Sequence, residues 1–341
     1  MTQTPLAPMP EPAAAAPVTS RLRIALRCVA IASCLPYMLL KAAWISGSHL
    51  GVPDGSSLLD HRSTMIVANS LSVLMDSAVV VIALLLTQAW GRRVPAWLLA
   101  LPMWAATGLL LPIMTGYPLQ LLVKALGGEI TATGGSARPF LDEWVFAVVY
   151  TGFIIQGLTL GTLFALYARD RWGHLWQGTL RELPDSPTAP ALRAAAVAAS
   201  LIALVPGTMH LLWAAGSTTG LNEAVIDEST SGSQVLDAVD VLFAAAAVAG
   251  VLLLAFRRGS ALALRVPLAL AWGGSGAMAC WGGWMSIASL SNVDDIAHQP
   301  TAAMVLVYAV QMLVGTLVMT LGGYFLVERA AGIRPPAGLR A

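Results

Sequence analysis

Charged residues are scarce in this sequence, and lysine is almost absent. Only 11% of the 341 residues are charged and 57% are hydrophobic, whereas a soluble domain of this length carries about 25% charged residues. The two lysines are Lys41 and Lys124, and no basic block interleaved with aromatic residues is present, which excludes a nucleic-acid-binding protein. The composition predicts a multi-pass membrane protein. Its abundant alanine, glycine and proline, with arginine in place of lysine, favour a bacterial plasma membrane.

Cysteine and histidine are too few or too scattered for several chemistries. The three cysteines, Cys28, Cys34 and Cys280, lie in apolar stretches and have neither disulfide-framework nor metal-site spacing. Only His210 of the five histidines lies clearly inside an apolar stretch, so a haem held between two facing histidines is excluded. Neither a phosphate-binding Gly-Lys motif nor a nucleophile elbow occurs. We therefore expect no metal ion and no cofactor.

Long apolar stretches make up most of the chain. A helix needs about 20 apolar residues to cross the hydrocarbon core of a bilayer, and eight stretches qualify. They cover residues 24–46, 64–90, 94–115, 143–168, 190–214, 234–256, 264–289 and 302–327. The sequence therefore predicts an all-α integral membrane protein with eight transmembrane helices.

Arginine determines the expected orientation, because positively charged residues stay on the cytoplasmic side of a membrane. The loops that would face outward contain only Arg62, Lys124 and Arg138. Fifteen arginines lie on the other side, namely Arg21, Arg23, Arg27, Arg92, Arg93, Arg169, Arg171, Arg181, Arg193, Arg257, Arg258, Arg265, Arg329, Arg334 and Arg340. All eight stretches fit this alternation, so both termini are expected in the cytoplasm.

One segment occurs twice in the chain. Residues 25–51 and 191–220 both open with Ala-Leu-Arg, carry a proline in the middle and close with Trp-x-x-Gly-Ser-x-x-Gly. Shorter matches follow, such as Arg-Val-Pro at 93–95 and again at 265–267. We therefore expect two tandem units of four helices. Because four is an even number, the two units are parallel, with the same orientation in the membrane.

The duplication divides the chain into five parts. They are a disordered tail rich in proline and alanine (residues 1–20), a first membrane repeat (21–172), a cytoplasmic linker (173–189), a second membrane repeat (190–333) and a C-terminal tail (334–341). The halves differ most in the external loop 116–142. We expect a short amphipathic helix at 118–126 to lie there on the bilayer surface. A lid over an outward-facing cavity is the alternative.

Charged side chains inside the apolar stretches give the best indication of a site, because each costs ~2.5–3.5 kcal/mol at mid-bilayer. They are Lys41, Asp76, His210 and Asp240, with Asp237 one turn from the last. From its nearest cytoplasmic arginine, each of the first four lies about 21 to 25 Å along its own helix. We therefore expect two related pairs in the outer half of the membrane, one formed by Lys41 and Asp76 and one by His210 and Asp240.

These charged groups have more than one interpretation. Paired charges can simply lock two helices together. They can also bind a ligand or exchange protons, for which histidine is suited because it titrates near physiological pH. Secondary residues that could line the same cavity are Asn69, Tyr150, Gln156, Tyr308 and Gln311. Single amides and hydroxyls in membrane helices, however, commonly bond a neighbouring helix.

The repeated segment carries a signature in which a lysine or histidine is followed by Trp-x-x-Gly, at Lys41 and again at His210. It resembles that of small, mostly actinobacterial, multi-span membrane proteins of unknown function. The resemblance covers about thirty residues in each half. It implies a tandem relative of those proteins and brings no activity with it.

The sequence favours a protein that binds, and transports, a small molecule or ion through the outer polar site. Its expected partners are the lipid bilayer and that ligand, and homo-oligomerisation stays open. Two alternatives also stay open. One is a membrane-embedded enzyme or redox protein, and the other is a structural, sensory or immunity protein.

Overall fold

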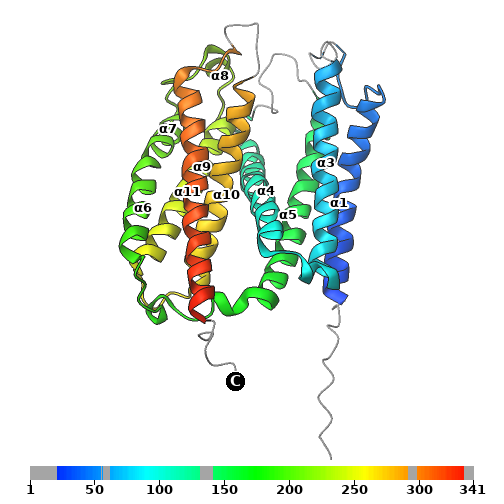
Figure 1. Cartoon of the computed structure of the whole chain (residues 1–341). Helices are drawn as coiled ribbons and strands as arrows, with labels where there is room; N and C mark the ends of the chain where they lie inside the picture. The colour runs from blue at the N-terminus through cyan, green and yellow to red at the C-terminus, as the bar shows by residue number, and fades with distance from the viewer. Residues whose placement is uncertain (1–20, 55, 57–61, 131–140, 291–297, 334–341) are drawn as a thin grey trace, which may run out of the picture.

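The protein is almost entirely helical. The computed structural model describes residues 21–54, 56, 62–130, 141–290 and 298–333, so both expected tails lie outside the described residues. Helices make up 81% of the structure, and the described residues form no β-strand. The long helices run side by side in one bundle (Figure 1). This arrangement confirms the expected all-α fold.

The helices divide into two halves on either side of a linker. The first half contains α1 (Arg21–Ile45), α3 (Arg62–Thr87), the short 3-10 helix η1 (Ala89–Arg93), α4 (Ala96–Ala125) and α5 (Glu143–Trp172). The linker contains η2 (Gly173–Leu175) and η3 (Leu180–Glu182). The second half contains α6 (Ala189–Ile202), α7 (Leu204–Ala214), α8 (Glu223–Asp227), α9 (Ser231–Phe256), α10 (Arg265–Ala288) and α11 (Ala302–Ile333). We call the end of the bundle with the linker the linker end and the opposite end the α8 end (Figure 1).

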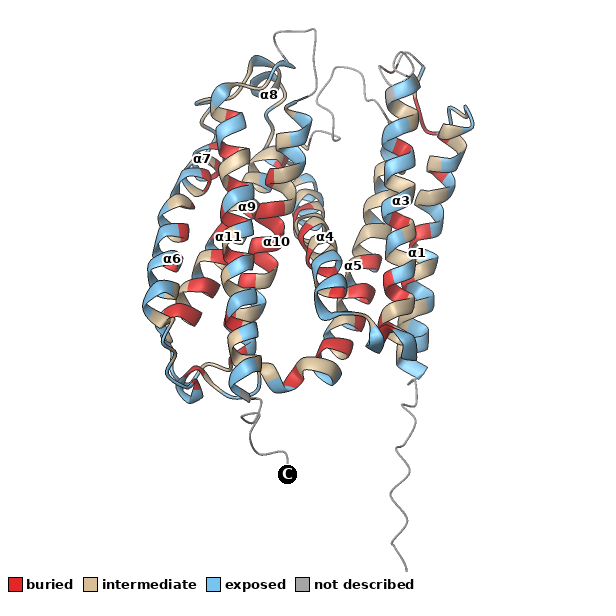
Figure 2. Cartoon of the chain, in the orientation of Figure 1, coloured by how far each residue is buried: buried red, intermediate tan, exposed pale blue. Residues whose placement is uncertain are grey.

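Seven helical stretches are long and apolar enough to cross a membrane. They are α1, α3 from Met65 onward, α4, α5 together with η2, α6 together with α7, α9 and α11. This finding confirms a multi-pass membrane protein. The remaining expected span, α10, is a helix of 24 residues that is not among these seven. It lies inside the bundle, where many of its residues are buried (Figure 2).

Glycine allows α10 to approach three neighbouring helices at backbone distance. A Cβ atom built on Gly274 would lie 2.4 Å from the backbone nitrogen of Ala247 in α9. On Gly108 of α4 it would lie 2.3 Å from the carbonyl oxygen of Gly276, and on Gly315 of α11 it would lie 2.4 Å from a backbone nitrogen of α10. Because the missing side chains make room for the neighbouring backbones, α10 packs closely against α9, α4 and α11.

The two halves have separate apolar cores and are joined mainly through α4. The largest cluster of buried side chains lies within residues 180–325, and another lies within residues 30–167. The same Arg-Val-Pro motif precedes α4 and opens α10. Helix α4 nevertheless packs both on α5 and on α9 and α10 of the second half. At this contact the indole of Trp104 donates a hydrogen bond to the Ser275 hydroxyl (3.0 Å).

The two copies of Trp-x-x-Gly-Ser-x-x-Gly adopt the same local structure. The indole of Trp44 donates to the carbonyl oxygen of Leu50 (2.7 Å), and that of Trp213 donates to the carbonyl oxygen of Thr219 (3.0 Å). The first glycine of each copy ends the helix in the left-handed conformation, with φ of 96° and 87°. Both tryptophans are buried. Each copy therefore turns the chain back over the end of its own helix.

The amphipathic helix expected at 118–126 is not a separate element. Helix α4 runs without interruption to Ala125, through Pro118. A proline is tolerated in a membrane helix because neighbouring groups satisfy the freed backbone atoms. Beyond α4, the carbonyl oxygen of Glu129 accepts a hydrogen bond from the Gly232 N–H near the start of α9 (3.0 Å). The expectation of a surface helix is therefore wrong, and residues 131–140, on which a lid would depend, lie outside the described residues.

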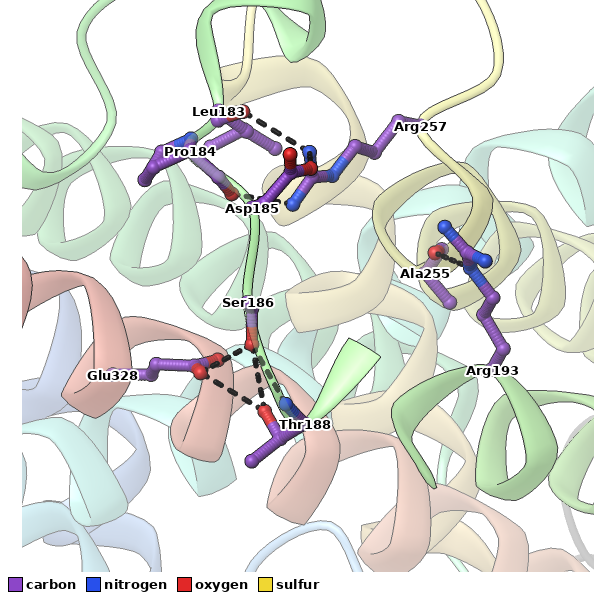
Figure 3. Close-up of polar contacts among 9 residues, drawn as sticks. All are labelled: Leu183, Pro184, Asp185, Ser186, Thr188, Arg193, Ala255, Arg257 and Glu328. Carbon is purple, nitrogen blue, oxygen red and sulfur yellow. Dashed lines mark hydrogen bonds and ion pairs between the residues drawn. The ribbon is translucent and has the colours of Figure 1, made fainter. Parts of the chain in front are cut away.

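The linker is bound to the second half at the linker end. Figure 3 shows Arg257, which follows α9, donating to the carbonyl oxygens of Leu183 (3.0 Å) and Pro184 (2.5 Å). Glu328 of α11 accepts hydrogen bonds from the hydroxyl groups of Ser186 and Thr188. Residues 183–188 of the linker therefore belong structurally to the second half.

Arg257→Ala is expected to release the linker without unfolding the helices. The loss of charge-assisted bonds to two carbonyl groups destabilises this contact by about 1–3 kcal/mol, so the linker opens roughly tenfold more often. Limited digestion with proteinase K should cut residues 178–188 correspondingly faster. Arg258→Ala removes the exposed neighbouring arginine and serves as the control. Equal cutting rates in the two variants would show that Arg257 does not hold the linker.

Candidate functional site

Four polar side chains of the second half meet near the α8 end, and we call them the histidine cluster. They are His210 on α7, Asp237 and Asp240 on α9, and Gln311 on α11. A break separates α6 from α7 shortly before Pro206, whose ring lacks the N–H group that would bond the preceding turn. His210 follows one turn later and is only 6% exposed. The interruption is one residue, Ala203, whose backbone is itself helical (φ −63°, ψ −19°), and it lies about 10 Å along the helix from His210.

The histidine cluster is a closed network of polar contacts. Nδ1 of His210 lies 2.8 Å from Oδ1 of Asp237 and 3.8 Å from Oδ2 of Asp240. Nε2 of His210 lies 3.1 Å from Oε1 of Gln311. The Gln311 side-chain amide in turn donates to Oδ1 of Asp240 at 3.1 Å. The imidazole is therefore held through both of its nitrogens. The structure brings His210 and Asp240 together, although the closer carboxylate is Asp237.

The network determines where the imidazole carries a proton. An ionised Asp240 only accepts hydrogen bonds, so the Gln311 amide turns its NH₂ group toward that carboxylate. The Gln311 oxygen then faces Nε2 of His210, which must carry a proton in order to donate to it. Nδ1 of His210 lies 2.8 Å from Oδ1 of Asp237, a hydrogen-bond distance that requires a second proton shared between the imidazole and that carboxylate.

Among the described residues, no lysine or arginine pairs with the two carboxylates. Within the described part of the chain, the ion pairs of Asp237 and Asp240 are with His210 alone, and residues 194–256 contain neither lysine nor arginine. Tyr308 lies close to both aspartates. The side chains of Asp237 and Asp240 are 23% and 26% exposed. The carboxylates are therefore partly accessible, whereas the imidazole is enclosed.

Three of these side chains offer donor atoms for a metal ion. One nitrogen of His210 and one oxygen each of Asp237 and Asp240 all lie within 4.8 Å of one another. Imidazole and carboxylate groups are ligands of divalent transition metals. The sequence contains no metal-type spacing, because two carboxylates three residues apart are a weak pattern. The third donor comes from another helix, and only the fold brings it near.

The corresponding residues of the first half are neighbours without the same contact. Asp76 of α3 is buried, its polar neighbours are Lys41 and Gln156, and its Oδ2 has no hydrogen-bond partner. Among the described residues Lys41 forms no ion pair. Its Nζ lies 4.7 Å from the ring centroid of Tyr37 and 5.2 Å from that of Trp44, within cation–π distance. We call Lys41, Asp76 and Gln156 the lysine cluster.

The secondary polar residues divide between these two clusters and the helix contacts. Gln311 and Tyr308 join the histidine cluster, and Gln156 joins the lysine cluster. Asn69 is buried on α3, and Tyr150 packs on the ring of a tyrosine in α4. Residues 308 and 311 are three positions apart, so the sequence shows that they share a helix face. It does not show that this face meets α7 and α9.

The histidine cluster lies in the part of the bundle nearest α8. Asp237 is six residues from the start of α9, so it lies about 9 Å along the helix from that end. Toward the linker end, the apolar core within residues 180–325 fills the space among the helices of the second half. The cluster is therefore closer to the α8 end than to the linker end.

Comparison with known proteins adds no family to this geometry. No protein-family model, curated protein or solved structure matches the chain. Since a fold alone does not determine function, the function has to be argued from the chemistry of the site.

Proposed function

We propose that this chain is a membrane transporter that binds a small cation at the histidine cluster. The closed network of His210, Asp237, Asp240 and Gln311 is the observation that supports this function. Ionisable groups inside a membrane bundle are costly, and they commonly mark substrate or ion pathways. Two carboxylates with a single imidazole between them leave a negative charge, which a small cation would balance.

The architecture that we propose has eight spans in two parallel four-helix units, with α10 as the eighth span. The matching tryptophan loops and the separate cores of the halves support a tandem origin. The 24 residues of α10 cover about 36 Å, more than the ~30 Å of the hydrocarbon core. The linker end, rich in arginine, would be the cytoplasmic side of a bacterial plasma membrane. The histidine cluster then lies in the outer half of the bilayer.

Transport also requires an exit toward the cytoplasm, and the packed core below the cluster closes that route in this conformation. Pro206, whose ring removes a backbone hydrogen bond from the span formed by α6 and α7, supports a conformational change, because a helix can kink at a proline. We infer that α7 moves relative to α6 and carries His210 with it. Such a movement would disconnect the imidazole from the carboxylates of α9 and release the cation.

A membrane-embedded enzyme is the second candidate. One imidazole and two carboxylates whose donor atoms lie within 4.8 Å of one another also provide a general acid and a general base. The two functions differ in their outcome, since a transporter moves its ligand unchanged across the membrane whereas an enzyme converts it.

Asp240→Asn is expected to abolish cation accumulation while the protein still reaches the membrane. Asparagine keeps the volume of the side chain and its acceptor oxygen for Gln311, but it removes one negative charge. Loss of one partner from a buried charged pair lowers affinity by roughly 30-fold or more. Cells that express the wild type, the variant or an empty vector are washed, and their sodium, potassium, magnesium, manganese, cobalt and zinc contents are measured by mass spectrometry.

Asp185→Asn provides the matched control, because Asp185 is an exposed carboxylate in the linker and should behave as wild type. Equal metal contents in wild-type and empty-vector cells would overturn cation transport. An effect of the wild type that survives Asp240→Asn would exclude the histidine cluster from the transport path.

A further inference from the structure

We propose that the histidine cluster is a binding site for a divalent transition-metal cation. The ligands are Nδ1 of His210 and one carboxylate oxygen each from Asp237 and Asp240. The inference rests on the proposed function in one respect, because it names the class of cation that the transporter would carry. The binding step itself depends only on the side chains of the cluster.

The two donor separations that involve the imidazole are close to those that such a metal requires, and all three donors lie within 4.8 Å of one another. Bonds of about 2.0–2.2 Å to imidazole and carboxylate ligands separate the donors of a tetrahedral site by about 3.3–3.6 Å. Nδ1 of His210 lies 2.8 Å from Oδ1 of Asp237 and 3.8 Å from Oδ2 of Asp240. The two distances bracket the required value. Small rotations of the carboxylates, which are partly exposed, are sufficient to close the site around an ion.

Gln311 holds the imidazole in the orientation that a metal ligand needs. A metal-bound histidine usually carries its proton on the distant nitrogen and donates it to a carboxylate, a carbonyl oxygen or water. In this protein Nε2 of His210 faces Oε1 of Gln311, and the Gln311 NH₂ group is fixed by Asp240. Nδ1 is thereby directed at the carboxylates, and a metal ion would replace the proton that Nδ1 shares with Asp237. A pair that only locked two helices together would need no third helix to orient the ring.

The surroundings of the cluster favour cations. Residues 194–256 contain no lysine or arginine, and their acidic residues are Glu223, Asp227, Glu228, Asp237 and Asp240. The first three lie on or beside α8, at the same end of the bundle as the cluster (Figure 1). A set of charges of one sign raises the local concentration of the opposite ion. The acidic residues at α8 would therefore concentrate metal cations next to the site.

The lysine cluster provides an internal comparison. Lys41 occupies the position in the first copy of the repeated segment that His210 occupies in the second, and its neighbouring carboxylate is Asp76. An ammonium group neutralises a carboxylate without any ion from solution. The second half has an additional carboxylate in Asp237 and a histidine instead of the lysine. We therefore infer that, of the two clusters, the one in the second half alone binds a metal ion.

The donor set also selects the class of metal. Calcium and magnesium prefer oxygen ligands alone, whereas a mixed imidazole and carboxylate site suits manganese, iron, cobalt, nickel or zinc in the divalent state. Monovalent copper prefers sulfur ligands, and the cluster contains no cysteine. Co²⁺ is a suitable probe, since its visible absorption reports the ligands and geometry around it.

The test is a titration of the purified full-length protein in detergent with Co²⁺, followed by visible absorption. We expect one Co²⁺ per chain, displaced by Zn²⁺ and not by Mg²⁺. Loss of a residue that only orients a metal ligand typically weakens binding ~10–100-fold, and we expect this for Gln311→Leu. Asp237→Asn removes a ligand and should weaken binding by more than that. Asp185→Asn, at the linker end, should bind as the wild type does. Elution volume and thermal midpoint establish that each variant is folded.

The results separate this inference from the proposed function. Absence of a Co²⁺ spectrum, or binding that Asp237→Asn leaves unchanged, overturns the metal site. If cells then still accumulate a monovalent cation and this accumulation depends on Asp240, the proposed transport is supported and the assignment of a transition metal is wrong. Co²⁺ binding by the purified protein without any change in cellular metal content upholds the metal site and refutes transport.

Discussion

Gly274→Ala is expected to destabilise the protein by about 3 kcal/mol or more and to reduce the yield of folded protein sharply. The added Cβ would lie 2.4 Å from the backbone nitrogen of Ala247 and 2.6 Å from the carbonyl oxygen of Phe243. Overpacking of a core costs about 1–3 kcal/mol, occasionally more. Here the neighbours are backbone atoms of α9, which cannot rotate away. The two helices must therefore separate, and α10 loses its fit to α4 and α11 as well.

The measurement compares the elution profile and thermal midpoint of the variant with those of the wild type after extraction in the same detergent. Gly322→Ala on α11 is the matched control, because nothing lies within 4 Å of a Cβ at that position. Alanine favours a helix more than glycine does, so this control should be as stable as the wild type or slightly more stable. If Gly274→Ala behaves like the control, α9 and α10 do not pack through this glycine.

The membrane spans could be predicted from the sequence because lipid imposes a simple requirement on length and apolarity. Seven stretches of the structure meet that requirement. Helix α10 is not among them. Hydropathy measures the preference of a helix for lipid, whereas α10 faces protein on several sides and uses glycine for close packing. A helix that packs in this way can fall short of the criterion whether or not it crosses the membrane.

The candidate site could be predicted in part, from the cost of charge inside a membrane. This cost indicated His210 and Asp240, and the structure brings them together. The sequence could not show that Asp237 is nearer to the imidazole, because the two aspartates are one turn apart and the choice depends on the rotation of α9. Gln311 was one of several polar residues in apolar stretches. Its bridging position depends on how α11 packs against α7 and α9.

The difference between the halves could not be read from the repeated segment. That segment determines the tryptophan loops, which are local and alike. It does not determine the path of α4, which depends on Gly108 meeting Gly276 of the other half. Nor does it show that Lys41 contacts aromatic rings whereas His210 contacts carboxylates. Such contacts depend on residues far apart in the chain, so the two copies can share a motif and differ in chemistry.

His210→Lys is expected to leave the protein folded and to weaken Co²⁺ binding by more than about 100-fold. This is more than the loss of a residue that only orients a metal ligand would cause. The substitution gives the second half the residue of the first. The lysine ammonium can pair with Asp237 and Asp240, so the buried negative charge stays balanced. It has no lone pair for a metal, however, and it occupies the place of the ion. Co²⁺ titration and the thermal midpoint measure the two effects on the same sample.

His210→Ala measures how much the imidazole contributes to stability, and it is compared with His210→Lys. Removal of the imidazole leaves two carboxylates without their partner, and breaking a buried charged pair costs about 3–5 kcal/mol. A site that serves mainly as a helix lock therefore predicts a lysine variant that matches the wild type in every property, since the lock is preserved. A metal site predicts a lysine variant that matches the wild type in stability alone. Wild-type Co²⁺ binding by His210→Lys would thus reject the metal site even if both variants fold.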